Sequence, residues 1–204
     1  MEYRKNEVYV LTITDVDMDG NGVGKLEGFP IFVKDTVIGD RAEVKLVKVK
    51  KNYGYGRLVR LLQPSEKRVE PQCRVARQCG GCQLQFYSYQ EQLKFKENKV
   101  KNNLDRIGKA EGYLLHPIIG MEEPFRYRNK AQFPIGRDKQ GQPIAGFYAG
   151  RTHSIIEQED CVIGRKENKE ILRVILDFMK EYRILPYREE NHSGLVRHIL
   201  IRQG

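Results

Sequence analysis

The sequence predicts an α+β protein with more than one domain, in which a small five-stranded β-barrel precedes a mixed α/β domain. Residues 7–62 alternate short β-forming runs with turn residues, and apolar residues recur at helical spacing in residues 88–107 and 168–182. All four cysteines lie after the barrel. We therefore expect one domain over residues 1–63 and a second over residues 64–204.

Length and composition exclude several classes of protein. The 204 residues provide for one or two domains, and a hydrophobic content of 40% is enough for globular cores. No apolar run approaches the roughly 18–20 residues that span a bilayer, and the first residues lack the apolar segment of a secretory signal. Four cysteines without such a signal are typical of a reducing compartment. We therefore expect a cytoplasmic protein without a membrane partner.

Runs rich in β-branched and aromatic residues make up most of residues 7–62, and turn residues such as Gly39 and Asp40 separate them. Four or five short strands in this length favour a closed barrel of the oligonucleotide-binding type. A barrel without a ligand is the alternative. The glycines from Gly20 to Gly24 are not a dinucleotide fingerprint, because its third glycine would stand at Lys25. We interpret them as turn residues with positive φ.

Positive charge is concentrated in the second half of the barrel. Lys and Arg number 36 against 27 Asp and Glu, which gives a formal charge of +9. The stretch from Val44 to Arg60, with both ends counted, contains six basic residues and no acidic residue. Because phosphates attract cations and rings stack on unpaired bases, this pattern favours a nucleic-acid surface, with a solvated cationic surface as the alternative. The candidate contacts are Lys45, Lys48, Lys50, Lys51, Tyr53 and Arg57.

A run of alternating cations follows the first predicted helix. Arg126, Arg128 and Lys130 stand at every second position, so an extended strand would direct all three to one face. Three cations on one sheet face favour contact with phosphate, and a solvated strand face is the alternative.

Capping signals mark the ends of the first predicted helix. Ser88 with Glu91 three residues later is the pattern of a capping box, and Gly108 fits a helix end. The helix expected over residues 168–182 presents an apolar face formed by Ile171, Val174, Ile175, Phe178 and Met179.

The cysteine spacing indicates a metal or redox centre. Cys73, Cys79 and Cys82 share one glycine-containing stretch, and Cys161 stands much further along the chain. Three thiolates on one loop plus a distant fourth are typical of iron–sulfur clusters. Structural zinc, a redox pair of Cys79 with Cys82, and four unligated thiols are the alternatives. Zinc sites usually have two C-x-x-C pairs, and the redox pair lacks a thioredoxin-like context.

Motifs along nearly the whole chain match one enzyme family. Pro71 to Gln85 contains three cysteines and two adjacent glycines, and Asp19 to Gly24 with Gly39-Asp40 precedes it. The motifs that follow are Tyr127 to Phe133, Gly146-Phe147-Tyr148, Asp160-Cys161 and Gly194 to His198. In this order they resemble the RNA (uracil-5-)-methyltransferases, most closely the bacterial 23S rRNA enzymes, with the first motifs similar to a TRAM domain.

The resemblance implies an OB-like TRAM domain that binds RNA over residues 1–63 and a central α/β domain over residues 64–204. It implies 23S rRNA as the partner of a monomeric protein, without DNA, because members that modify tRNA are expected to lack the TRAM domain and the cluster loop. Phe147 is a further candidate for stacking on RNA. The implied ligands of a 4Fe–4S cluster are Cys73, Cys79, Cys82 and Cys161.

In this family a third domain binds S-adenosylmethionine, and a cysteine of that domain attacks C6 of uracil before C5 is methylated. This sequence stops before such a domain and has no fifth cysteine. We therefore expect no catalytic residue, no S-adenosylmethionine site and no methyl transfer by this chain alone. Helix 88–107 could pack on the absent domain. Two alternatives are a stand-alone TRAM-type RNA-binding protein without catalysis and an iron–sulfur electron carrier or redox sensor.

Overall fold

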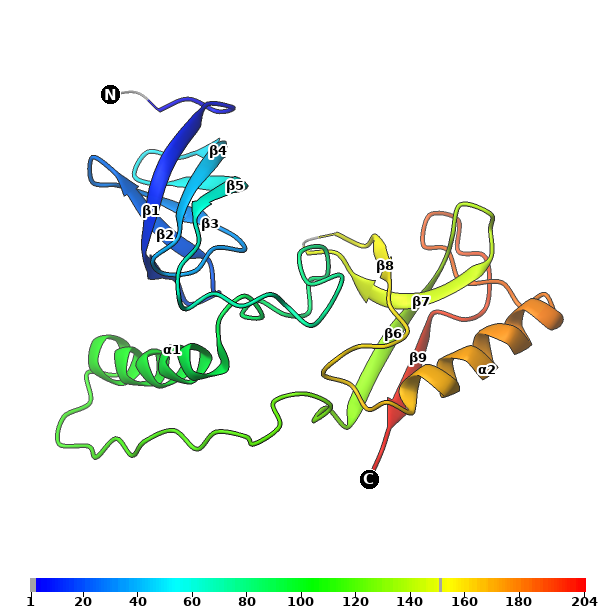
Figure 1. The fold of residues 1–204 in the computed structure, drawn as a ribbon. Coiled ribbons are helices and arrows are strands. Elements are labelled where there is room, and N and C mark those ends of the chain that lie inside the picture. Colours follow the sequence, from blue (N-terminus) through cyan, green and yellow to red (C-terminus); the bar gives the residue numbers. More distant parts are fainter. Residues whose placement is uncertain (1–2, 151) are drawn as a thin grey trace. The chain divides into compact units, whose positions relative to one another are not determined.

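The computed structural model describes residues 3–150 and 152–204 (Figure 1). The chain folds into two compact units, each built from two separate stretches of sequence. The first unit contains the chain up to Pro71 together with Gln83–Gly120, and the second contains Gln72–Cys82 together with Met121–Gly204. Residues 83–120 thus cluster with the barrel, whereas the sequence prediction grouped them with the second domain.

Five strands close into a barrel in the first unit, which confirms the barrel predicted from the sequence. Their order around the barrel is β1-β2-β3-β5-β4, and every neighbouring pair is antiparallel except β3 and β5. The strands are β1 (Val8–Val16), β2 (Gly22–Leu26), β3 (Phe29–Val33), β4 (Arg41–Val49) and β5 (Gly54–Gln63).

Strand β2 contains two of the glycines that the sequence analysis assigned to a turn. Gly20 does have a positive φ of 85°, but Gly22 and Gly24 are buried inside the strand. A Cβ atom at Gly22 would lie 2.2 Å from the hydroxyl oxygen of Thr36. The turn interpretation is therefore wrong for Gly22 and Gly24, because close packing rather than chain reversal requires glycine there.

Apolar side chains fill the interior of the barrel. Ile31, Val33, Val44 and Leu46 are completely buried there. A Cβ atom at Gly56 would lie 2.2 Å from Cγ1 of Val44, so even a methyl group does not fit at that point. Ligands of the barrel must consequently contact its outer surface.

Helix α1 (Tyr89–Asn102) begins where the capping signal predicts. The Ser88 hydroxyl accepts the backbone N–H of Glu91 at 3.4 Å, which confirms the N-cap. The second contact of a capping box, from the Ser88 backbone N–H to the Glu91 carboxylate, is replaced by an ion pair of Glu91 with Lys94 at 2.6 Å. A π-helical turn over Asn103–Ile107 follows α1, so the helical segment has the predicted length. Gly108 ends it as predicted but has a φ of −74°, and the left-handed residue is Lys109 instead.

The second unit is built on a four-stranded antiparallel sheet in the order β8-β7-β6-β9. Helix α2 (Asn168–Glu181) covers one face of this sheet (Figure 1). Phe133 on β6 and Leu172 on α2 are completely buried in the core between them. The strands are β6 (Lys130–Arg137), β7 (Pro143–Tyr148), β8 (Ile155–Glu157) and β9 (His198–Arg202).

Helix α2 has nearly the predicted length, but the face it buries shares only Ile175 and Met179 with the predicted one. Leu172, Leu176 and Met179 point into the core, together with the partly buried Ile175. Three members of the predicted apolar face are exposed instead, namely Ile171, Val174 and Phe178. The helix is apolar around much of its circumference, so periodicity alone does not select the face that meets the sheet.

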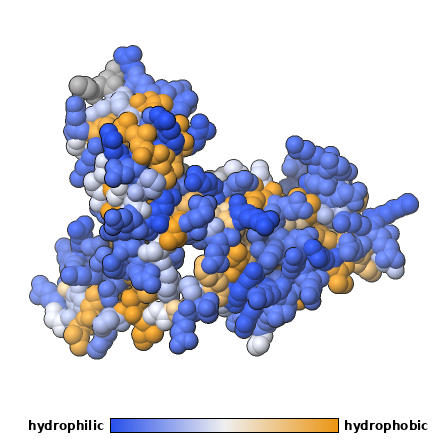
Figure 2. Space-filling view, viewed as in Figure 1, coloured by the Kyte–Doolittle hydropathy of each residue, from blue (hydrophilic) through white to orange (hydrophobic). Residues whose placement is uncertain are grey.

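Hydrophilic residues cover most of the face shown in Figure 2, with apolar residues gathered in smaller patches. Among the helices in the described part of the chain, none has the length and apolar character needed to cross a membrane.

Candidate functional sites

Three aromatic rings form a cluster on the outside of the barrel. Phe32, Tyr53 and Tyr55 lie with their ring centroids 5.7–5.8 Å apart in every pair, and all three are half-buried. The β3–β5 pairing brings Phe32 opposite Tyr55. Because Ile31 and Val33 point inward, the alternation of the strand turns Phe32 outward. We call these three residues the aromatic cluster; Tyr53 was predicted, whereas Phe32 was missed although the alternation signals it.

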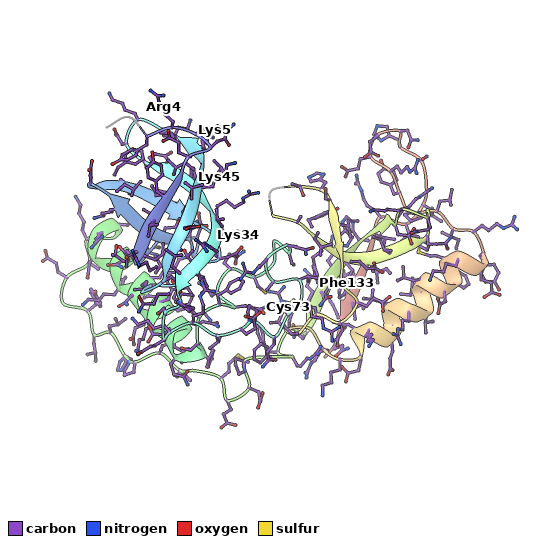
Figure 3. All side chains as sticks on the ribbon, turned by 45° about the horizontal axis from the view of Figure 1, so that its top comes forward. Arg4, Lys5, Lys34, Lys45, Cys73 and Phe133 are labelled. Atoms are coloured by element: carbon purple, nitrogen blue, oxygen red, sulfur yellow. The ribbon has the colours of Figure 1, made fainter. Side chains whose placement is uncertain are left out.

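Lysine and arginine side chains lie beside the aromatic cluster in the β4–β5 ladder. Lys48 is paired with Tyr55 in the register, and Lys45 is opposite Arg57. Figure 3 shows Lys45 on the barrel strands. Like charges directly opposite each other on neighbouring strands are destabilising without a counter-ion, so this arrangement favours an anionic partner. Arg60 differs from these cations, because Glu43 engages its guanidinium at 2.7 and 2.8 Å.

The segment around Arg126 is not the strand that the sequence predicts. Strand β6 begins only at Lys130, and Arg126 has a left-handed φ of 56°. Its guanidinium donates to the backbone oxygen of Cys161 at 2.9 Å and pairs with Asp160, which holds the pKa of that carboxyl below its usual range. Arg126, Arg128 and Lys130 therefore do not share one strand face, and Arg126 is engaged by the Cys161 loop.

Phe147 on β7 is directed toward the core of the second unit. Its ring centroid lies 5.0 Å from that of the completely buried Phe133. Phe147 also packs against the remainder of that core. This position does not support the prediction that Phe147 stacks on an RNA base.

All four cysteines belong to the second unit, and all four are free thiols. Burial raises the pKa of the Cys73 thiol, and the neighbouring thiols of Cys161, Cys79 and Cys82 raise it further. The fold therefore brings the distant Cys161 into electrostatic range of the loop over Gln72–Cys82, on which Figure 3 shows Cys73. Among residues 3–150 and 152–204, no group of three or more His, Cys, Asp or Glu side chains is arranged to hold a metal ion.

Backbone contacts fix the cysteine-bearing loop against the end of β7. The Gly80 N–H donates to the carbonyl oxygen of Tyr148 at 2.9 Å, and Cys79 forms a β-bridge with Ala149. A Cβ atom at Gly80 would lie 3.0 Å from that same oxygen, so glycine permits this close approach. The Gly81 N–H donates to Sγ of Cys79 at 3.3 Å.

Comparisons with known proteins found matches for the barrel and for nearly the whole chain. Residues 3–59 match the TRAM domain family. An RNA methyltransferase of Halalkalibacterium halodurans, described as uncharacterized, is 46% identical over 98% of this chain and 43% of its own length. A protein of the same description from Oceanobacillus iheyensis is 45% identical with the same coverage. The chain thus spans less than half the length of the curated relatives it matches.

A solved structure resembles both units. The crystal structure of Pyrococcus abyssi tRNA (uracil-54, C5)-methyltransferase, in complex with S-adenosyl-L-homocysteine, matches 96% of this chain and 42% of its own, with a TM-score of 0.65 and 26% identity. The match covers nearly the whole chain, so this architecture does not by itself separate rRNA enzymes from tRNA enzymes. Similarity beyond the barrel also does not favour a stand-alone TRAM protein. The chain carries a TRAM domain and is, over 98% of its length, a homologue of proteins named as RNA methyltransferases.

Proposed function

We propose that this chain is the RNA-binding and iron–sulfur part of an RNA (uracil-5-)-methyltransferase that uses S-adenosylmethionine. The observation that carries the proposal is the aromatic cluster of Phe32, Tyr53 and Tyr55 beside Lys48, on a barrel that belongs to the TRAM family. Stacking of a base on an aromatic side chain is worth about 1–3 kcal/mol, and neighbouring cations hold the phosphates. Since the barrel interior is filled, RNA contacts this outer surface.

Binding of labelled single-stranded RNA at several salt concentrations tests the barrel surface. Tyr53→Leu should weaken binding about tenfold, the loss of one stacked base. Lys48→Met should lower the slope of log affinity against log salt by about 0.7, the value for one phosphate contact in a single strand. Lys180→Met changes an exposed lysine on α2 and should leave both quantities unchanged. Equal effects of Lys48→Met and Lys180→Met would contradict this assignment.

We further propose that Cys73, Cys79, Cys82 and Cys161 hold a 4Fe–4S cluster. Thiolates are the ligands that iron–sulfur clusters use, and the thiols of Cys79, Cys82 and Cys161 all raise the pKa of the Cys73 thiol. The cluster would connect the loop over Gln72–Cys82 to the segment of Cys161 and so stabilise the second unit.

Metal analysis of anaerobically purified protein tests the cluster. We expect iron and sulfide in equal amounts with a broad visible absorbance, and the loss of both in Cys161→Ser. Zinc without sulfide would contradict the proposal and favour a structural zinc site instead. Four cysteines bound to the cluster leave none to attack uracil, so this chain by itself should transfer no methyl group.

The proposed substrate of the whole enzyme is a uridine of 23S rRNA, as the sequence motifs imply. A uridine of tRNA is the second candidate, and the structural match to a tRNA (uracil-54, C5)-methyltransferase favours it. Competition between 23S rRNA fragments and tRNA for binding to this chain separates the two. The preferred competitor should displace the probe at a concentration at least about tenfold lower, and equal displacement would argue against a substrate preference in this chain.

A further inference from the structure

The second unit contains a cleft that the proposed function does not use. Its cavity measures about 220 Å³, less than the 300 Å³ or so at which sites for larger ligands begin. Three stretches form the walls: the end of β6, a second stretch that contributes Tyr148, His153 and Ile155, and a loop over residues 186–197. The loop is tightly closed, since a Cβ atom at Gly194 would lie 2.1 Å from the carbonyl oxygen of Pro186. The shape of the cleft is therefore built into the fold.

Aromatic rings line two sides of the cleft. The rings of Tyr148 and His153 are tilted by 31° to each other, with their centroids 5.4 Å apart. On the loop over residues 186–197, Arg197 lies over the ring of Tyr187 at 4.6 Å, and the Tyr187 hydroxyl is 2.9 Å from Nδ1 of His192. Tyr148, His153 and Arg197 are all exposed, so a flat ligand can reach these surfaces.

One buried donor in the cleft has no acceptor among the described residues. Glu189 is engaged by Arg197 at 2.8 Å and by His153 at 3.2 Å, and these contacts lower the pKa of its carboxyl. Glu190 also lines the cleft but is exposed to water. Nε of Arg137, at the end of β6, is buried and has no hydrogen-bond partner among the described residues. A buried N–H without an acceptor is costly, and a guanidinium pairs well with an anionic oxygen, so an anion beside Arg137 would be favoured.

We propose that this cleft binds one unpaired nucleotide of an RNA strand. Its base would stack on Tyr148, and a phosphate would lie against the guanidinium of Arg137, which lines the cleft. An acidic peptide would also satisfy Arg137, but it would leave the aromatic walls unused. A base-paired nucleotide does not present its face for stacking, so the cleft selects single-stranded segments. This inference rests on the proposed RNA-binding function and adds a second contact site, separate from the barrel.

The test compares affinities for a labelled unpaired oligonucleotide and for a duplex of the same length. Arg137→Met removes the guanidinium and keeps an unbranched side chain, while Tyr148→Leu removes the ring and leaves the backbone oxygen that Gly80 uses. Each should weaken binding of the unpaired strand about tenfold and leave duplex binding unchanged. Lys139→Met, an exposed lysine beyond the end of β6, is the matched control and should behave like the unchanged chain.

A second experiment crosslinks the unchanged chain to RNA that contains 4-thiouridine. Because it uses no substituted protein, unfolding of a variant cannot affect its result. Crosslinks in residues 148–155 or at Tyr187 are expected. Crosslinks confined to the barrel, with both variants binding like the unchanged chain, would overturn this inference and leave the proposed function intact. If the unchanged chain did not bind RNA, both this inference and the proposed function would be contradicted. Binding of an acidic peptide that depends on Arg137, without RNA binding there, would also overturn it.

Discussion

The carboxylate of Asp40 is completely buried against the guanidinium of Arg68, whose Nε lies 3.1 and 3.2 Å from the two carboxylate oxygens. Asp40 also accepts the backbone N–H of Val37 at 2.7 Å and that of Ser65 at 2.9 Å. The guanidinium in turn lies 5.3 Å above the ring of Phe86. One buried ion pair thus fixes the turn before β4 to the segment that follows the barrel.

Asp40→Ala should destabilise the first unit by about 3–5 kcal/mol, because it leaves the guanidinium of Arg68 buried without its partner. Urea unfolding measures the change. Glu43→Ala removes the carboxylate of an exposed pair with Arg60 and serves as the control, with little expected change in the free energy of unfolding. If the two variants lost similar stability, the buried pair would not have the role described here.

Leu172→Ala should destabilise the second unit by about 2–5 kcal/mol, because its side chain is completely buried between α2 and the sheet. Val174→Ala, on the same helix but 70% exposed, should change the free energy of unfolding by less than about 0.5 kcal/mol. Thermal or urea unfolding of both variants checks the face of α2. If Val174→Ala lost more unfolding free energy than Leu172→Ala, the face predicted from the sequence would be the buried one.

Alkaline pH should destabilise the first unit through Tyr87. Burial raises the pKa of this phenol to about 12 from the ordinary value of 10.0. The folded chain therefore holds the proton more tightly than the unfolded chain does, so the stabilisation is complete below pH 10 and is lost as the pH rises through about 12. Tyr87→Phe should show a shallower decline of unfolding free energy over this range. Parallel declines for the two proteins would rule out Tyr87 as the source.

Arg126→Met should shorten the lifetime of the proposed cluster in air, because the guanidinium holds the backbone oxygen of Cys161 at 2.9 Å. Decay of the visible absorbance measures the lifetime, which we expect to fall several-fold while RNA affinity stays the same. Arg128→Met is the control, since Arg128 is exposed, and it should leave the lifetime unchanged. If Arg126→Met instead lowered RNA affinity and left the lifetime unchanged, Arg126 would contact RNA phosphate, as its alternation with Arg128 predicts.

Local signals in the sequence predicted most of the helices and strands but not the residues that they pack against. Ser88 predicts the start of α1 because a cap is a contact between residues three apart. By contrast, Gly22 looks like a turn residue because its reason for being glycine is Thr36, which only the closed barrel brings near. The face of α2 depends in the same way on the sheet that covers Leu172.

Some of the candidate sites could be recognised from the sequence, and others could not. Cys73 and Cys161 are recognisable from residue type and spacing, and the fold brings them into electrostatic range. Arg126 misled the alternation argument, since one left-handed residue is enough to break a strand pattern. The cleft of the second unit has no sequence signal at all, because Arg137, Tyr148 and Arg197 come from three distant stretches.

The division of the second unit into two stretches has a consequence for proteolysis. Residues 109–127 contain no helix or strand and are mostly exposed, so a protease would cut there first. Such a cut would separate Cys73, Cys79 and Cys82 from Cys161 along the backbone. With the proposed cluster bound, iron would join the two fragments, and an iron chelator would weaken their association. The uncut chain would stay in one piece after the same treatment.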